Sequence, residues 1–253
     1  MRFDNKCALV TGGGSGIGRA VCLAFAAEGA NVGVADVSLA GAEVTAQEVR
    51  KGGNKAVALG VDVSDPASVQ AMVNRAVATL GRIDLLVNSA GVREIVPFLQ
   101  LPFVEWQRVI ATNLTGTFLC SQAVARYLVE QGRGGKIVNL ASVAGLTAVP
   151  NRAAYVSSKH AVVGLTKEMA LELADSNIQV NAVAPGVVRT SMTESYFDNP
   201  EVVAGLKKAH PAGRWAQPEE IANLILFLAS PAADFITGAT FPIDGGFMAG
   251  KAF

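Results

Sequence analysis

Residues 7–18 read Cys-Ala-Leu-Val-Thr-Gly-Gly-Gly-Ser-Gly-Ile-Gly, and this stretch decides the fold. It joins a short apolar run to a glycine-rich turn, and an amphipathic run over 19–28 follows and ends at Gly29. This order predicts a strand, a turn and a helix. Glycine permits positive φ and lets the backbone approach a ligand, and the free N–H groups at the start of a helix suit a pyrophosphate. The alternative is an ordinary glycine-rich turn of an α/β protein.

A second apolar run, 31–35, ends at Asp36. An acid about 20 residues past such a turn is placed to accept hydrogen bonds from the ribose hydroxyls of an adenosine. A carboxylate there repels the additional 2′-phosphate of NADP, and no Lys or Arg lies between Glu28 and Glu43 to bind one. We therefore expect NAD(H) rather than NADP(H). Asp36 as a turn or helix cap is the alternative.

Apolar runs and amphipathic runs alternate along the rest of the chain. We expect strands at 7–10, 31–35, 56–61, 85–88, 136–140, 179–183 and 240–242. We expect helices at 19–28, 40–52, 66–80, 104–131, 154–174 and 218–228. The strands carry little polar alternation, which is typical of a parallel sheet buried on both faces. The pattern predicts one α/β domain over 1–253, a doubly wound parallel sheet of about seven strands with helices on both faces.

The segment 187–213 breaks this alternation and has no clean period. It begins after Pro185-Gly186, beyond a predicted strand, where ligands bind in open α/β sheets. We therefore expect a substrate lid here. A disordered surface loop is the alternative.

Composition excludes several classes of protein. Apolar residues make up 51% of the 253 residues and the formal net charge is zero, so no basic patch suggests a nucleic-acid partner. No apolar stretch reaches membrane-spanning length and no targeting signal opens the chain, so we expect a soluble, cytoplasmic protein. The three cysteines stand far apart, and neither His160 nor His210 has a cysteine nearby, so we expect no disulfide and no metal site.

Residues 155–159 read Tyr-Val-Ser-Ser-Lys. On a helix, positions i and i+4 share a face, so Lys159 lies one turn from Tyr155. A cation there favours the phenolate and brings the tyrosine pKa closer to working pH, where it exchanges protons with an alcohol or a ketone. A Tyr and a Lys at this spacing also occur on ordinary helix surfaces.

Taken together, these motifs resemble the short-chain dehydrogenase/reductase family in its compact form of about 250 residues. The resemblance runs nearly end to end. It rests on the following motifs: Thr11 to Gly18, Asp36, Asp62-Val63, Asn88-Ser89-Ala90-Gly91, Asn113, Ser142, Tyr155/Lys159, Pro185-Gly186 with Arg189-Thr190, Thr237-Gly238-Ala239 and Asp244-Gly245-Gly246. Two departures are Ser89, where the family often has an Asn that stabilises the central sheet, and Ala141, where Ser is common.

The resemblance implies a Rossmann-like fold, a catalytic set and a cofactor site. The implied catalytic residues are Asn113, Ser142, Tyr155 and Lys159. The implied NAD site comprises Gly12, Ser15, Gly16, Ile17, Gly18, Asp36, Asp62, Val63, Asn88, Ala90, Gly91, Tyr155, Lys159, Pro185, Gly186, Val188 and Thr190. Tyr155 is then the general acid/base, Ser142 stabilises the alkoxide, and Asn113 holds a water that links Lys159 to solvent. Ser142 as a turn residue and Asn113 as part of a helix distortion are the alternatives.

The substrate is less well defined by the sequence. By resemblance, the pocket residues are Arg93, Glu94, Ala144, Val149, Asn151, Val187, Met192 and Tyr196. Arg93 and Glu94 either bind a polyol or an acid, or form an exposed ion pair. We expect an oxidoreductase that interconverts a secondary alcohol and a ketone. A sugar or polyol dehydrogenase, a 3-oxoacyl thioester reductase and a non-catalytic dinucleotide sensor follow in that order.

Apolar residues occupy more than one face of the predicted helices 104–131 and 154–174. Leu114, Phe118, Val162, Leu165 and Met169 cannot all face the sheet, and exposed apolar bands mark interfaces. The resemblance implies a homotetramer assembled through these helices and the C-terminal segment.

Overall fold

The structure, a computed structural model, describes residues 1–250, so the last three residues of the predicted domain, 251–253, lie outside it. Within 1–250, seven strands form one sheet in the order β3-β2-β1-β4-β5-β6-β7, and every pairing is parallel. The strands are β1 Cys7–Thr11, β2 Asn31–Asp36, β3 Ala56–Gly60, β4 Leu85–Asn88, β5 Gly135–Leu140, β6 Ile178–Pro185 and β7 Thr240–Ile243. The predicted fold class is confirmed.

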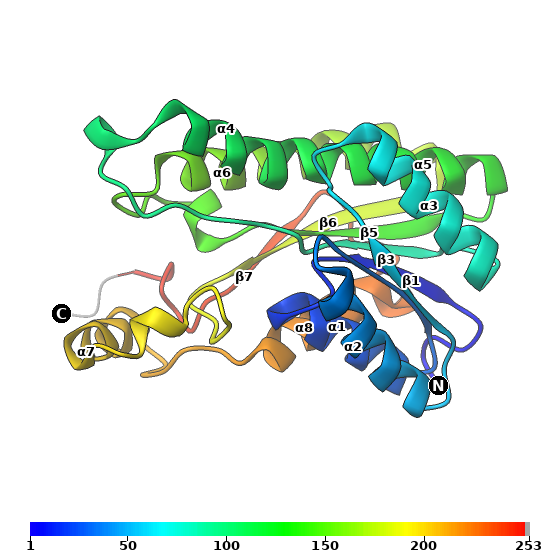
Figure 1. Ribbon diagram of the computed structural model, residues 1–253, viewed down its shortest axis with the longest axis horizontal. Coiled ribbons are helices and arrows are strands. Elements are labelled where there is room, and N and C mark those ends of the chain that lie inside the picture. Colours follow the sequence, from blue (N-terminus) through cyan, green and yellow to red (C-terminus); the bar gives the residue numbers. More distant parts are fainter. Residues whose placement is uncertain (251–253) are drawn as a thin grey trace.

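Helices cover both faces of the sheet (Figure 1). The helices are α1 Gly16–Ala27, α2 Leu39–Lys51, α3 Pro66–Leu80, α4 Phe103–Ile110, α5 Gly116–Gln131, α6 Ala153–Glu172, α7 Pro200–Ala209 and α8 Pro218–Ala229. α1, α2 and α8 lie on one face, and α3, α5 and α6 on the other. Neighbouring residues of β1 serve opposite faces, since Val10 packs into the first apolar layer and Leu9 into the second. A strand covered on both faces therefore carries mostly apolar side chains at successive positions, which explains the lack of polar alternation.

Local signals set the helix ends. Asp65 accepts hydrogen bonds from the N–H groups of Ala67 and Ser68, and Pro66 starts α3 at the position where a missing N–H is harmless. Gly81 ends α3 with φ +84°, a conformation that glycine adopts without strain. In α8 the side chain of Glu220 accepts from the Gln217 N–H and completes a capping box.

The predicted helix 104–131 is one rod with a defect. α4 and α5 are joined without a break by a single wide π turn, Ala111–Thr115. Such a turn inserts an additional residue into the helical repeat, and it often occurs at functional sites. It carries Asn113, which is fully buried.

The segment 187–213 contains a helix, α7, that the sequence analysis did not predict. Asn199 caps it by accepting from the Glu201 N–H, Pro200 occupies its first turn, and two lysines occupy its last turn. No residue of α7 is fully buried, and its short apolar stripe of Val203 and Leu206 is only half-buried. Figure 1 shows α7 projecting from the body of the molecule.

Both ends of this segment are held together. Val188 and Ala216 form a parallel bridge. The Ala216 N–H donates to the Val187 carbonyl at 2.9 Å, and the Arg189 N–H donates to the Ala216 carbonyl at 3.0 Å. The residues between Val188 and Ala216 therefore form a loop whose two ends, its stem, are fixed to each other by the backbone.

None of the helices in residues 1–250 is both long enough and apolar enough to cross a membrane.

Candidate active site

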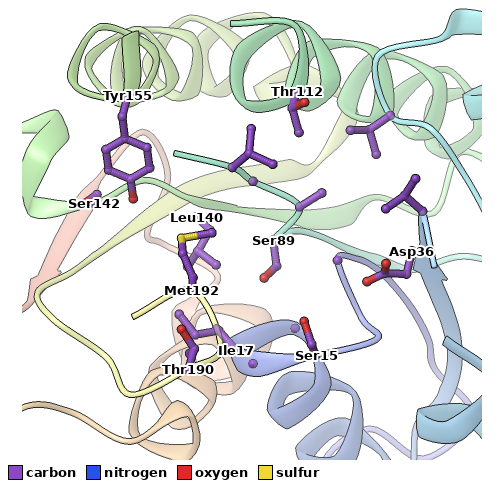
Figure 2. Close-up of a pocket in the computed structure, with 18 of the residues that line it drawn as sticks. Ser15, Ile17, Asp36, Ser89, Thr112, Leu140, Ser142, Tyr155, Thr190 and Met192 are labelled. Carbon is purple, nitrogen blue, oxygen red and sulfur yellow. The ribbon is translucent and has the colours of Figure 1, made fainter. Parts of the chain in front are cut away.

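A cavity of about 600 Å³ opens over the carboxyl ends of the parallel strands. Because all strands run the same way, the segments that follow β1 to β6 meet at this edge of the sheet. Figure 2 shows Ser15 and Asp36 at one end of the cavity, here called the glycine end. Tyr155 and Ser142 lie at the other, here called the tyrosine end.

The glycine end is formed largely by backbone. A side chain at Gly12, whose φ is +66°, would place its Cβ 2.8 Å from the backbone of Ala90. A Cβ at Gly18 would lie 2.1 Å from the Gly12 carbonyl oxygen. These close approaches leave the first N–H groups of α1 facing the cavity, where they suit a phosphate. Thr11 holds the opposite wall, since its hydroxyl accepts from the N–H groups of Ser89 and Ala90.

Asp36 ends β2 and lines the cavity. One of its oxygens accepts from the Gly14 N–H at 2.9 Å and the other from the Ser38 N–H at 2.9 Å. The carboxylate thus fixes the glycine turn and still keeps lone pairs for hydroxyl groups of a ligand. Asp62 plays a related structural part after β3, because its hydrogen bonds to the backbone and hydroxyl of Ser64 hold the turn and lower the pKa of Asp62.

The structure places all but one of the predicted cofactor residues on the cavity wall. The exception is Asn88, whose side chain turns into the core. Its amide group donates to Ser121 at 2.8 Å and to Asn139 at 2.9 Å, which ties β4 to α5 and β5. Ser89, one residue later, lines the cavity instead. The sheet is therefore bridged by Asn88, although Ser89 stands where the family often has an Asn.

The tyrosine end brings together Tyr155, Ser142 and Lys159. Tyr155 descends from the first turn of α6, and Figure 2 shows its hydroxyl inside the cavity beside Ser142, which follows β5. Lys159 is buried one turn further along α6, and its ammonium donates to the Leu140 carbonyl at 2.6 Å. The ammonium nitrogen lies 5.7 Å from the centroid of the Tyr155 ring. A proton-transfer group, a hydroxyl donor and a cation thus share one site.

The pKa values at this end differ from the prediction. Burial raises the pKa of Tyr155, and a hydrogen bond from Ser142 and the charges of Arg93 and Arg152 oppose this only in part. Burial also lowers the pKa of Lys159 to about 8. The expected lowering of the tyrosine pKa by Lys159 is therefore wrong for the protein without ligand. The i, i+4 spacing is present, but burial dominates the pKa of each group, and the charges that oppose the rise at Tyr155 are those of Arg93 and Arg152.

Asn113 lies behind the cavity wall rather than on it. Its side-chain oxygen accepts from the Val92 N–H at 2.8 Å, and its amide group donates to the Val92 carbonyl and to Ser158. These bonds fix the segment after β4 against the π turn. A Cβ at Gly91 would lie 3.4 Å from the Asn113 oxygen and 3.8 Å from the Lys159 nitrogen, so both groups flank the same glycine.

Of the predicted substrate residues, only Met192 lines the cavity. Arg93 does not pair with Glu94 in residues 1–250. Glu94 is buried and accepts from the N–H groups of Ala154 and Tyr155, so it caps the N-terminus of α6. The exposed-ion-pair alternative is therefore wrong.

The other predicted substrate residues lie around the cavity. Ala144 is buried behind Ser142, and Val149 is half-buried. Asn151 is exposed with φ +63°, and its carbonyl accepts from the Val96 N–H. The Val187 N–H faces the ring of His210 at 3.5 Å.

Tyr196 is held from two sides. Its hydroxyl accepts from the guanidinium groups of Arg93 and Arg152. Arg93 also donates to the Met192 carbonyl.

Other residues at this site were not predicted from the sequence. Arg152 belongs to no motif, but it stands three residues before Tyr155 and contacts Tyr196. Further cavity-lining residues that were not assigned to the site are Val37, Val61, Ser64, Ser89, Arg108, Ala111, Thr112, Leu140, Ala141, Ser191 and Thr193. Their proximity to the motifs along the chain was a usable signal for Val37, Ser64 and Ala141.

Comparison with known proteins places this arrangement among related enzymes. A family model described as enoyl-(acyl carrier protein) reductase matches residues 12–248. A D-threitol dehydrogenase of Mycolicibacterium smegmatis is 45% identical over 249 residues, covering 98% of this chain and 94% of the relative. A cyclohexanol dehydrogenase of an Acinetobacter species is 40% identical over 247 residues, covering 97% and 96%.

Solved structures agree in fold and in sequence. A short-chain type dehydrogenase/reductase from Mycobacterium marinum superposes with a TM-score of 0.93 at 41% identity, covering 98% of this chain and 97% of that one. A protein described as a putative 2-deoxy-D-gluconate 3-dehydrogenase from Agrobacterium tumefaciens, with bound NADP, superposes with a TM-score of 0.91 at 36% identity, covering 98% of each.

Proposed function

The chain belongs to the short-chain dehydrogenase/reductase family, and on this premise we propose that it is an NAD(H)-dependent enzyme that interconverts a secondary alcohol and a ketone. It is an oxidoreductase of the alcohol and polyol dehydrogenase class, like its relatives named for threitol and cyclohexanol. The observation that carries the proposal is the single cavity with a glycine turn at one end and Tyr155 with Ser142 at the other.

The residues at the glycine end fit a nicotinamide dinucleotide. Gly12 and Gly18 let the backbone of the turn pack more closely than any side chain would permit, and the start of α1 suits a pyrophosphate. Asp36 stands at the end of β2, where a ribose is held in such folds. Lys159 and Thr190 line the same cavity closer to Tyr155, and we assign them to the nicotinamide half.

Tyr155 is the proton-transfer residue in this mechanism. The bound dinucleotide supplies the carbon that takes or gives the hydride. In oxidation, Tyr155 as the phenolate takes the hydroxyl proton of the alcohol, and in reduction its phenol returns a proton to the carbonyl oxygen. Burial raises the pKa of Tyr155, which favours the phenol form that the reductive direction uses. Proton transfer of this kind contributes roughly 10² to 10⁴ in rate.

Ser142 and Lys159 assist this step. The hydroxyl of Ser142 donates a hydrogen bond to the oxygen on which negative charge develops, as an oxyanion hole does. Lys159 supplies positive charge beside Tyr155, with its ammonium held by the Leu140 carbonyl. Asn113 positions the segment after β4, which forms part of the cavity wall, through its bonds to Val92. We assign a solvent-linking water to Asn113 as the family resemblance implies.

Asp36 supports NAD(H) as the cofactor, because its carboxylate opposes a 2′-phosphate and no basic residue stands between Glu28 and Glu43. Because a structural neighbour is described with bound NADP, the preference of this chain for NAD(H) has to be tested. We expect kcat/KM with NAD⁺ to exceed that with NADP⁺ at least tenfold. The variant Asp36→Ala should narrow the ratio, and equal values in the unaltered enzyme would contradict the proposal.

A substrate screen tests the reaction itself. Absorbance at 340 nm is followed with NAD⁺ and a panel of secondary alcohols, sugars and polyols, and with NADPH and a 3-oxoacyl thioester. We expect oxidation of a secondary alcohol or a polyol. Activity confined to the thioester would replace our proposal with the reductase that the description of the family model suggests.

We also propose a homotetramer in the cytoplasm. A groove of about 420 Å³ lies between α5 and α6, and it includes Phe118 and Val129, which are exposed in the single chain. Exposed apolar surface of this kind supports an interface. The three cysteines, Cys7, Cys22 and Cys120, are buried and free, which suits a reducing compartment. Light scattering at micromolar concentration tests the assembly, and a monomer mass would exclude it.

A further inference from the structure

Two arginines converge on one neutral group beside the tyrosine end. Arg93 follows β4 and Arg152 immediately precedes α6, yet the guanidinium groups of both donate to the hydroxyl of Tyr196. The Arg93 guanidinium carbon lies 4.5 Å from the centroid of the Tyr196 ring, and that of Arg152 lies 5.8 Å from it. Three segments distant in the sequence thus meet in one cluster. Its two arginines, Arg93 and Arg152, are here called the pair.

The positive charge of this pair exceeds the negative charge beside it. Among residues 1–250, no ion pair includes Arg93 or Arg152. The neighbouring carboxylate of Glu94 caps the N-terminus of α6 through one oxygen, and its other oxygen has no hydrogen-bond partner within the described residues, so its single charge offsets at most one of the two cations. Two half-buried cations that share a phenol oxygen repel each other, and a neutral acceptor offsets little of that repulsion. An anion between them would remove it.

Nearby arginines do not share this property. Arg108 pairs with Glu105, and Arg189 pairs with Glu194. Unbalanced positive charge is therefore specific to the pair and is not a general feature of the rim.

The pair lies close to the reacting groups. Burial raises the pKa of Tyr155, and the charges of both arginines oppose this rise, so both act on its phenol. Arg93 also donates to the carbonyl of Met192, whose residue lines the cavity. An anion bound by the pair would therefore belong to a molecule that reaches Tyr155 from the side of the 187–213 segment. The phosphate-binding turn is at the opposite end of the cavity.

We propose that the substrate is a hydroxy acid, a secondary alcohol whose carboxylate is bound by Arg93 and Arg152 beside Tyr196. The guanidinium group is planar and always charged, and its paired N–H donors match the two oxygens of a carboxylate. This inference rests on the proposed dehydrogenase function and narrows its substrate class. It also distinguishes this chain from an enzyme for neutral alcohols.

Matched substrates test the inference. kcat/KM is measured with NAD⁺ for 3-hydroxybutyrate against butan-2-ol and for gluconate against sorbitol, with glycerol 3-phosphate as a phosphate-bearing alcohol. We expect the carboxylate member of at least one pair to be preferred tenfold or more. A preference for the neutral members, or for the phosphate ester alone, would overturn the carboxylate assignment and leave the dehydrogenase function intact.

Variants test the two arginines. Arg93→Gln and Arg152→Gln should each reduce the acid-to-neutral ratio of kcat/KM by roughly 10- to 100-fold, mainly through KM, as expected for a charged hydrogen bond. Arg75→Gln, at an exposed arginine of α3, is the matched control and should leave the ratio unchanged. An unchanged ratio in both of these arginine variants would overturn the inference.

Tyr196→Phe separates charge from loop position. This variant removes the hydroxyl that both arginines hold and retains both cations, so the acid preference should persist. A loss of preference equal to that of the arginine variants would show that the pair only anchors the 187–213 segment, and would overturn the inference.

If no alcohol is oxidised, the proposed function is contradicted. A binding measurement then tests the inference by itself. Calorimetric titration of 3-hydroxybutyrate into the protein, with and without NADH, then decides the inference alone. Binding that disappears in the double variant Arg93→Gln/Arg152→Gln supports the anion site, and absence of binding to the unaltered protein overturns it.

Discussion

The two ends of the cavity are built in different ways. The glycine end consists mainly of backbone, with turns so close that a Cβ at Gly18 would meet the Gly12 carbonyl oxygen at 2.1 Å. The tyrosine end depends on side chains from separate segments, and Arg93 and Tyr196 meet although they stand 103 positions apart. A backbone site recognises a group common to many enzymes, whereas a side-chain site changes with single substitutions. We therefore attribute cofactor binding to the glycine end and the choice of substrate to the tyrosine end.

The variant Tyr155→Phe should produce the largest effect at the tyrosine end. It removes the hydroxyl that transfers the proton, so kcat should fall by roughly 10² to 10⁴. NADH binding, measured by fluorescence, should persist because the glycine end is untouched. Tyr127→Phe, in α5, is the control and should retain turnover. A kcat within tenfold of the unaltered enzyme would remove Tyr155 from its proposed role.

The variant Gly18→Ala addresses the glycine end. Its Cβ would meet backbone rather than a flexible side chain, so the turn has to move. We expect a loss of up to about 3 kcal/mol in the free energy of unfolding, as for other overpacked sites, and a loss of dinucleotide affinity. Urea unfolding and NADH titration measure the two effects. Unchanged affinity would show that the turn does not cradle the cofactor closely.

The pH dependence of stability tests the buried cation at the tyrosine end. The pKa of Lys159 is lowered to about 8 in the folded protein, against a value near 10.4 in the unfolded chain. Below pH 8 both states carry the proton, and the folded state bears the cost of burying it. As pH rises from 8 towards 10 the folded protein releases its proton first, so stability increases over this window.

The variant Lys159→Met lacks this proton and provides the reference. Relative to it, the unaltered protein should gain about 2 kcal/mol in unfolding free energy between pH 7 and pH 9.5. Denaturant unfolding at the two pH values measures the difference. A constant difference would mean that Lys159 titrates as it does in water.

The variant Gly205→Ala should have the smallest effect and contrasts with Gly18→Ala. Gly205 lies inside the exposed helix α7, and its Cβ would meet nothing within 4 Å. Alanine there should stabilise the protein by about 0.5–1 kcal/mol, since glycine is a poor helix former. The midpoint of thermal unfolding should rise slightly. A fall would reveal a constraint on α7 that the single chain does not contain.

Backbone features and side-chain contacts also differ in how well the sequence predicts them. Apolar runs identified all strands of the sheet, because a strand buried on both faces needs such residues throughout. Helix α7 was missed because it is short and its apolar stripe is limited to Val203 and Leu206, which are only half-buried. Its cap and its first proline were visible, but these short signals also occur in loops.

At the site, sequence reasoning located residues that act through the backbone better than those that act through side chains. The turn at 12–18 lines the cavity as expected. The direction of the Asn88 side chain and the partner of Glu94 depended on tertiary packing. The pKa of Tyr155 depended on burial, which the spacing of Tyr155 and Lys159 does not reveal. Arg152 stands near Tyr155 in the sequence, but its contact with Tyr196 is made only in the folded chain.

The bridge between Val188 and Ala216 has a consequence for the diversification of such enzymes. With the stem closed by the backbone, the intervening chain can lengthen at little entropic cost, about 0.6 kcal/mol for each doubling of a flexible loop. The length of the segment between these two residues can therefore vary while the stem is kept, as long as the contacts of His210 and Ala212 with the body of the protein remain. A recombination library with crossovers at the two stem residues would explore new specificities on an unchanged scaffold.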